Sequence, residues 1–196
     1  MRKTIGMALA LATTLATGAV AQGTNVLRLT TGPEKRIWIE GSSTIRKFSC
    51  ATSSFEATPR PAPEPTAPLA SAVQAVEVRV PVSTLSCGNG TMDEHMRKAL
   101  KAEQNPEIRF ELKSYMVGEK TDAGTTVQAE GVMTIAGASK TVELTGVVTP
   151  TATGLRVQGS APLRMTEYGV KPPSLMLGTL KVADAITVHY DVVLER

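Results

Sequence analysis

Strict alternation of apolar and polar residues is the feature that most constrains the fold of this chain. It recurs in five long segments, at residues 76–82, 107–115, 142–148, 154–168 and 186–195. In EIRFELKSY, for example, Ile108, Phe110 and Leu112 alternate with charged residues. Successive side chains of a strand point to opposite faces, and antiparallel sheets commonly bury one face and leave the other in water. The pattern therefore predicts antiparallel strands with one apolar face.

Shorter alternating runs at residues 26–30, 35–40 and 45–51 bring the expected number of strands to eight. Short turns join consecutive runs, as at GASK (residues 137–140) and TATG (residues 151–154). Strands joined in this way form a meander, and eight twisted strands can close into a barrel that leaves no free edge. The predicted fold class is all-β, an eight-stranded antiparallel barrel.

A proline-rich segment, TPRPAPEPTAP at residues 58–68, interrupts the alternation. Its five prolines lack the N–H group that a sheet ladder requires. The segment is therefore predicted to be an extended connection on the surface.

Residues 92–103 form the only convincing helical pattern. Thr91 and Glu94 have the spacing of a capping box, and an Asn-Pro pair follows the segment. Met96 and Leu100 share one helical face and would pack on the sheet. The helix is predicted to act as a lid.

The first 21 residues have the layout of a secretory signal peptide. Two basic residues precede an apolar run of about a dozen residues, and Ala19 and Ala21 have the small-x-small spacing that signal peptidase prefers. The run is short for a membrane span, which needs roughly 20 residues, although a retained anchor is the alternative. Cleavage after Ala21 would leave residues 22–196 as a single domain, periplasmic or secreted.

The charge of the chain gives no support for nucleic-acid binding. The whole sequence has 21 basic and 18 acidic residues, a formal net charge of +3. Arg2 and Lys3 belong to the predicted signal peptide, so the mature chain has 19 basic residues against 18 acidic ones. No domain-sized basic excess is left to bind a phosphate backbone.

Cys50 and Cys87 are the only cysteines, and both lie in the part predicted to be exported. An oxidising compartment favours a disulfide between them. It would close a loop of about 37 residues and, by restricting the unfolded chain, stabilise the fold by roughly 4 kcal/mol. A reactive thiol or a metal site is the alternative, although neither cysteine has a CxxC partner or a histidine at ligand spacing.

Groups that could carry catalysis are few. His95 lies beside Asp93 and Glu94 on the predicted helix, but consecutive helical residues point about 100° apart, so these three do not converge on a metal ion and His95 is expected in solvent. His189 lies on the polar side of the last strand and is expected to be exposed or hydrogen-bonded. The sequence contains no GxSxG elbow and no GxxxxGK loop. It predicts no enzymatic activity, no cofactor and no metal site.

The interior of the barrel is the region expected to carry the function. Gly131, Gly146 and Gly159 are among the small residues that alternate into it, and small inward residues leave volume that a structural core would fill. Alternatively, these glycines only let the strands coil sharply. An eight-stranded barrel can hold one small ligand. The candidate ligand-contacting residues are the larger inward side chains Phe110, Leu112, Met133, Leu144, Leu163, Met165, Val188 and Tyr190.

Several longer segments resemble the YceI-like proteins. They are IWIEGSSTIRKFSC (residues 37–50), MDEHMRKALKAEQNPEIRFEL (residues 92–112), GVMTIAGASKTVELTGVV (residues 131–148) and LRMTEYGV (residues 163–170). Members of this family are exported proteins with a lipocalin-like antiparallel barrel, and some carry a polyisoprenoid chain in the cavity. The resemblance implies a lipocalin-like barrel whose cavity strands hold Phe110, Leu112, Met133, Leu144 and Met165. The proline-rich segment and the paired cysteines depart from the common pattern of the family.

These observations predict an exported carrier or sequestering protein that binds a polyisoprenoid or another long-chain apolar lipid in the barrel. The alternative is a non-catalytic structural or protein-interaction domain with a filled core. Transient contact with a membrane and a homodimer are further expectations, and a dimer that buries the wet strand faces would favour the structural alternative.

Overall fold

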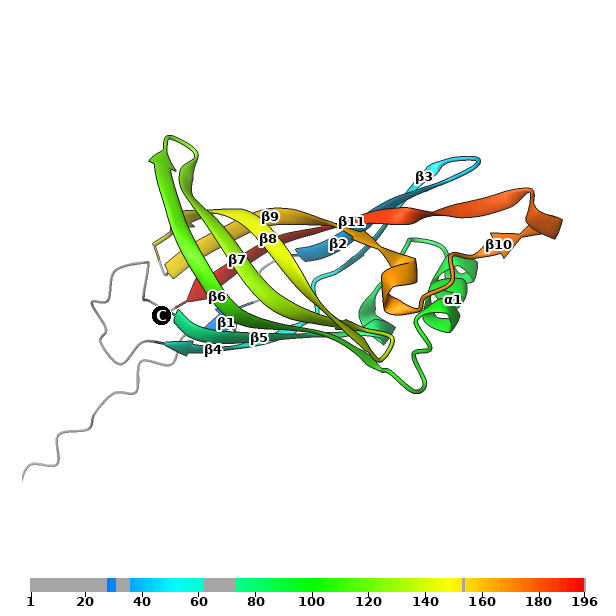
Figure 1. The fold of residues 1–196 in the computed structure, drawn as a ribbon, viewed down its shortest axis with the longest axis horizontal. Helices are drawn as coiled ribbons and strands as arrows, with labels where there is room; N and C mark the ends of the chain where they lie inside the picture. The colour runs from blue at the N-terminus through cyan, green and yellow to red at the C-terminus, as the bar shows by residue number, and fades with distance from the viewer. Residues whose placement is uncertain (1–27, 31–35, 62–72, 153, 196) are drawn as a thin grey trace, which may run out of the picture.

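The computed structural model describes residues 28–30, 36–61, 73–152 and 154–195 (Figure 1). The predicted signal peptide lies outside the described residues. The strands are β1 (Arg28–Thr30), β2 (Arg36–Ser43), β3 (Lys47–Thr52), β4 (Glu56–Pro61), β5 (Val73–Pro81), β6 (Glu107–Thr121), β7 (Gly124–Ile135), β8 (Ala138–Pro150), β9 (Gly154–Arg164), β10 (Ser174–Leu175) and β11 (Leu180–Glu195). One α-helix, α1 (Gly90–Ala99), and three short 3-10 turns, η2 (Val82–Thr84), η3 (Met165–Tyr168) and η4 (Met176–Gly178), complete the described part.

Nine strands form the continuous path of one antiparallel sheet, in the order β3-β2-β11-β9-β8-β7-β6-β5-β4, and the short β1 and β10 each pair with β11 off this path. From β4 to β9 the strands form the predicted meander, and β11 returns to lie between β9 and β2. The sheet curls around its long axis into a half-barrel with α1 at one end (Figure 1). The predicted fold class is confirmed, with nine strands on the continuous path of the sheet instead of eight.

The curled sheet does not close through a ladder between its two end strands, β3 and β4, in the described part of the chain. Two other connections join its sides. The short β1 pairs with the end of β11 and contacts β4. Near the other end, Ala51 of β3 forms an isolated bridge with Ser86.

The turn between β7 and β8 consists of Ala136 and Gly137, with φ angles of 49° and 83°. Two positive φ angles are typical of the two-residue turns whose twist matches that of the flanking strands. The turn is therefore shorter than the predicted GASK turn, because β8 already begins at Ala138.

The beginning of the proline-rich segment is a strand, which corrects the prediction of a surface connection. Residues 56–61 form β4 and pair antiparallel with β5, with a register shift between Arg60 and Pro61. β4 ends the sheet order. Proline is compatible with such a strand because the side facing away from the sheet needs no donor. Residues 62–68 lie outside the described residues.

The helix begins two residues earlier than predicted, and the capping-box prediction is wrong. Its N-cap is Asn89, whose side-chain oxygen accepts a hydrogen bond of 3.1 Å from the backbone N–H of Met92. Glu94 instead pairs with Lys98, one turn later, at 2.7 Å. The helix ends at Ala99, well before the predicted residue 103, because Lys101 has a positive φ of 52°.

The helix packs on the sheet as predicted. Met96 and Leu100 lie against a buried cluster of Phe55, Val80 and Leu85. Because α1 contributes apolar side chains on this face only, its position depends on this packing and on its attachment at the N-terminus.

We expect Asn89→Ala to lower the free energy of unfolding by about 1 kcal/mol, because the N–H of Met92 would lose its partner. Urea denaturation followed by circular dichroism measures the change. Thr91→Ala is the matched control, since Thr91 is exposed on the first turn and does not cap the helix. An equal loss in both variants would contradict the assignment of Asn89 as the cap.

Candidate functional site

An elongated apolar cavity of about 440 Å³ lies inside the curled sheet and beneath α1. Pockets that bind small molecules have volumes of roughly 300–1,000 Å³. All eight residues predicted to face a ligand lie on its wall: Phe110, Leu112, Met133, Leu144, Leu163, Met165, Val188 and Tyr190. Whether they contact a ligand stays a prediction.

More residues line the cavity than the eight that the sequence predicts. β2 contributes Ile37 and Ile39, β5 contributes Val78, and α1 contributes Met96. The alternation of β2 and β5 would have identified the strand residues, since Ile37 and Ile39 flank Trp38 and face the opposite side. Many inward side chains, such as Leu112, are only half-buried, because part of their surface faces the cavity instead of other side chains.

Gly131 and Gly159 do not create empty volume, which corrects part of the sequence interpretation, whereas the third inward glycine, Gly146, lies on the cavity wall. A Cβ atom on Gly131 would lie 2.4 Å from the ring of Phe110, and one on Gly159 would meet the hydroxyl and ring of Tyr190. Aromatic rings therefore already occupy the space above both glycines.

Tyr190 is a neutral part of the wall. Its hydroxyl donates a hydrogen bond of 3.1 Å to the backbone oxygen of Thr145. Burial raises the pKa of Tyr190 to about 12, because the phenolate would lose its hydration. Burial likewise raises the pKa of Tyr168, another wall residue, whose hydroxyl has no hydrogen-bond partner in the described part of the chain. Neither side chain brings a negative charge to the cavity at neutral pH.

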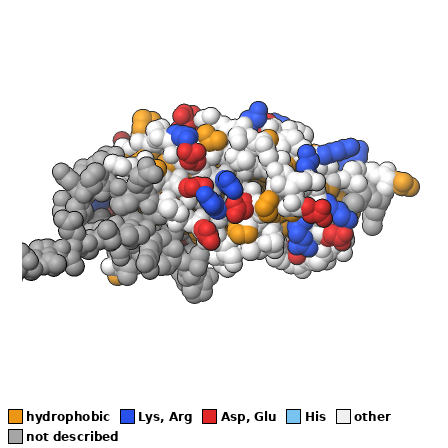
Figure 2. Space-filling model, turned by 90° about the horizontal axis from the view of Figure 1, so that it is seen from below, with side chains coloured by type: hydrophobic (Ala, Val, Ile, Leu, Met, Phe, Trp, Pro, Cys, Tyr) orange, Lys and Arg blue, Asp and Glu red, His pale blue; other side chains and the backbone are white. Residues whose placement is uncertain are grey.

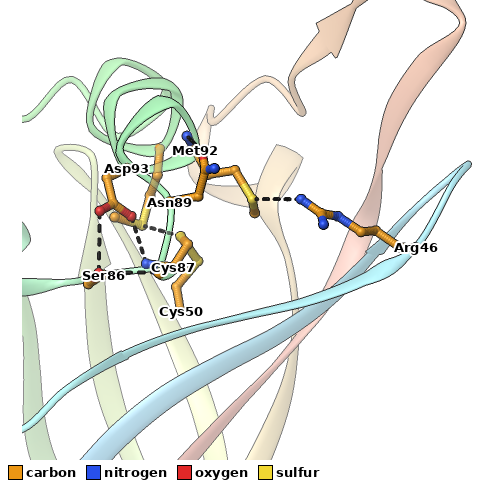
Figure 3. The surroundings of a disulfide bond; sticks show 9 residues. Arg46, Cys50, Ser86, Cys87, Asn89, Met92 and Asp93 are labelled. Carbon is orange, nitrogen blue, oxygen red and sulfur yellow. Dashed lines mark hydrogen bonds between the residues drawn. A yellow bond between two sulfur atoms is a disulfide. The ribbon is translucent and has the colours of Figure 1, made fainter.

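The ionisable side chains of the wall other than tyrosine and cysteine belong to basic residues and lie near one end. Among the described residues that line the cavity, they are Arg46, His95 and Arg164, and no carboxylate is among them. Arg46 reaches across from the β2–β3 loop to α1, with Nη2 at 3.6 Å from Sδ of Met92 (Figure 3). Since the exposed wall residues are Arg46 and Arg164, we call this end the mouth.

The two histidines lie in different surroundings. The prediction that His95 lies in solvent is wrong, because His95 is half-buried and lies on the cavity wall, on the same face of α1 as Met92 and Met96. His189 lies outside the cavity and stacks on Trp38, with ring centroids 4.8 Å apart. Its Nε2 lies 3.4 Å from a carboxylate oxygen of Glu40 without the geometry of a hydrogen bond. In the part of the chain that the structure describes, no group of three or more His, Cys, Asp or Glu residues has a metal-binding arrangement.

Cys50 and Cys87 form a disulfide, as predicted, with their Cα atoms 3.9 Å apart. Both residues also line the cavity. The bond joins β3 to the segment that precedes α1, and Asp93 of α1 accepts a hydrogen bond of 2.6 Å from the backbone N–H of Cys87 (Figure 3). The disulfide and Asp93 together tie the N-terminal end of the lid to the sheet.

Comparison with known proteins agrees with this fold. The YceI-like domain family matches residues 39–194. Among solved structures, Burkholderia cenocepacia BcnA is similar with a TM-score of 0.65 at 17% identity, covering 81% of this chain and 95% of that chain. A polyisoprenoid binding domain from Saccharophagus degradans, implicated in plant cell wall breakdown, has a TM-score of 0.64 at 12% identity, covering 87% and 98%.

A third similar structure is the Campylobacter jejuni YCEI protein, with a TM-score of 0.58 at 18% identity, covering 75% of this chain and 84% of that chain. No curated protein sequence matches significantly. At identities this low, the structural likeness concerns the fold, and the family match is the stronger relation.

Proposed function

This chain belongs to the YceI-like domain family, and from that premise we propose that it binds a polyisoprenoid or another long-chain apolar lipid in its cavity. The observation that carries the proposal is an elongated cavity of about 440 Å³ whose wall is almost entirely aliphatic and aromatic. The polyisoprenoid binding domain from Saccharophagus degradans, which has the same fold, supports the choice of ligand class. The role is one of binding, as a carrier or a sequestering protein.

The energetics of burial support this ligand class. Moving about ten methylene groups from water into an apolar site yields roughly 8 kcal/mol. Loss of translational and conformational freedom subtracts several kcal/mol. Micromolar affinity needs a net binding free energy of about −8 kcal/mol, so it requires burial of a chain longer than about ten methylene groups. The flexible wall residues Met133, Met165 and Met96 can adapt to an irregular chain.

The charges at the mouth favour a lipid that ends in a hydrogen-bond acceptor or an anion. Arg46 and His95 line the cavity there, and the acidic residues of α1 are engaged elsewhere: Asp93 with Cys87, and Glu94 with Lys98. Arg164 already has a carboxylate partner, Asp184, at 3.6 Å. The apolar tail would lie along the cavity, and the polar end would stay near Arg46.

We also propose that the mature protein is residues 22–196 and acts in the periplasm or outside the cell. The signal-peptide pattern of residues 1–21 motivates this location, and the disulfide between Cys50 and Cys87 is consistent with an oxidising compartment. No helix in the described ranges of the chain is long and apolar enough to cross a membrane.

The experiment that tests the function is native mass spectrometry of protein purified without detergent from its own compartment, followed by solvent extraction. We expect a co-purifying lipid. Protein freed of lipid should rebind a polyprenol and the matching polyprenyl phosphate, with the phosphate bound more tightly because of Arg46. Protein that carries no lipid and ignores both compounds would contradict the proposal.

A further inference from the structure

Two of the most exposed hydrophobic side chains lie at the same end of the molecule. Among the described residues, the large hydrophobic side chains left in solvent are Ile45 at 64% exposure, Met116 at 68% and Leu177 at 110%. Ile45 lies in the turn between β2 and β3, and Leu177 lies in η4, between β10 and β11. Both turns lie at the right-hand end in Figure 1, whereas Met116 belongs to the β6–β7 hairpin.

Hydrogen bonds hold these two turns together. The backbone N–H of Thr44 donates to the backbone oxygen of Lys181 at 2.9 Å, and its hydroxyl donates to the backbone oxygen of Thr179 at 2.9 Å. The N–H of Lys181 donates in turn to the hydroxyl of Thr44 at 3.2 Å. Residues 43–47 and 176–181 therefore form one unit, which we call the tip.

Folding alone does not explain the side chains that the tip displays. Leu177 has a φ of 54°, a conformation that costs energy for any residue with a Cβ and that Asn or Gly adopts more readily. A leucine here loses backbone stability and gains no burial. A partner that takes up aliphatic side chains would explain both Leu177 and Ile45.

The two segments that contain the tip carry charge of one sign. Residues 41–55 contain Arg46 and Lys47, residues 168–183 contain Lys171 and Lys181, and neither range contains an acidic residue. Lys47, Lys171 and Lys181 are exposed. In Figure 2, a hydrophobic side chain stands at the right-hand end, and Lys and Arg side chains lie behind it, with Asp and Glu side chains beside some of them.

We propose that the tip docks on an anionic lipid bilayer, with Ile45 and Leu177 inserted among the headgroups and the four basic residues facing the phosphates. Aliphatic side chains combined with Lys and Arg are the combination that binds this kind of surface. The tip adjoins the mouth of the cavity, because Ser43, Arg46 and Leu180 belong to the tip and line the cavity as well. A docked molecule therefore presents its cavity to the membrane, where a long-chain lipid can pass between the two.

The test is flotation of the purified full-length mature protein with vesicles. One set of vesicles is phosphatidylcholine, and the other is equal parts of phosphatidylcholine and phosphatidylglycerol. We expect binding to the anionic vesicles to be about tenfold tighter or more, since each basic residue near such a surface contributes about a fivefold factor. The Ile45→Ser, Leu177→Asn variant should lose about tenfold or more, and Asn suits the positive φ at position 177.

Met116→Ser is the matched control, because it removes an equally exposed hydrophobic side chain far from the tip, and it should bind vesicles as the wild type does. Lys47→Gln with Lys181→Gln should weaken binding to the anionic vesicles only. Equal flotation of the wild type and the double tip variant would overturn the proposal. So would a wild-type dimer that the tip variant converts to a monomer, since the tip would then be covered by a second copy.

The experiments can contradict the docking proposal and the proposed lipid binding in the cavity independently of each other. Protein that carries lipid but does not float on anionic vesicles contradicts the docking tip alone. Protein that floats but neither carries nor rebinds a lipid contradicts the cavity function alone.

Discussion

Ala129→Trp is expected to abolish lipid binding while leaving the protein folded. Ala129 lies on the cavity wall in β7, paired with Tyr115 of β6 and Leu144 of β8. An indole at this position would project into the middle of the cavity and occupy the path of an alkyl chain. We expect the affinity for a polyprenol to fall by about a hundredfold or more, which corresponds to roughly 3 kcal/mol. Isothermal titration with lipid-free protein measures the loss.

The same variant separates a lipid-binding cavity from a filled structural core. In an empty cavity the indole gains apolar burial, so the free energy of unfolding should rise by about 1–2 kcal/mol. In a filled core the same substitution would overpack the interior and cost about 1–3 kcal/mol. Urea denaturation gives the sign of the change.

Gln128→Trp is the matched control, because the neighbouring residue on β7 is exposed and points to the outer face. It should bind lipid within about twofold of the wild type, a difference of about 0.4 kcal/mol. A stable Ala129→Trp protein that still bound polyprenols as the wild type does would contradict a ligand site in this cavity.

The sequence predicts the inner wall well because the alternation within one strand decides which of its side chains face the interior of the whole sheet. Once the residues between Glu107 and Leu112 form a strand, Phe110 and Leu112 must share a face, and the apolar face must be the buried one. The same reasoning places Leu144, Leu163 and Val188 on the wall, where the structure has them. Cys50 and Cys87 follow from a different constraint, the pairing that an exported chain favours.

Features that depend on contacts between distant segments escape such reasoning. Arg46 is a mouth residue because the β2–β3 turn reaches α1, 46 positions later in the chain, where it meets Met92. His95 lines the cavity because it lies beside Met96 and one turn after Met92 on the face of α1 that covers the cavity, and the position of α1 over the cavity depends on the tertiary packing. The ring of Phe110 occupies the space beside Gly131, and this too could be predicted only by knowing the register of β6 against β7.

Removing the disulfide is expected to have the largest effect on stability. The bond between Cys50 and Cys87 links positions 37 residues apart and restricts the unfolded chain. We expect the Cys50→Ser, Cys87→Ser variant to lose about 4 kcal/mol of the free energy of unfolding, measured with urea without reductant. Reductant should destabilise the wild type by a similar amount and leave the variant unchanged. A wild type whose stability is indifferent to reductant would contradict this expectation.

The loss should also be visible locally, at the lid. Cys87 lies three residues before α1, and its backbone N–H is bound by Asp93 of the same helix. Without the covalent link, the N-terminal end of α1 is held to the sheet by non-covalent contacts. In the described part of the chain, these are the Ala51–Ser86 bridge, the hydrogen bonds from Ser86 and Cys87 to Asp93, the contact of Arg46 with Met92, and the packing of Met96 and Leu100. Opening of the lid alone then costs less than global unfolding, so the amides of α1 should exchange with solvent faster than those of β7 and β8. If the amides of α1 in the variant exchanged no faster than those of β7, this expectation would be contradicted. The disulfide would then stabilise the protein only by restricting the unfolded chain, and non-covalent contacts alone would hold the lid.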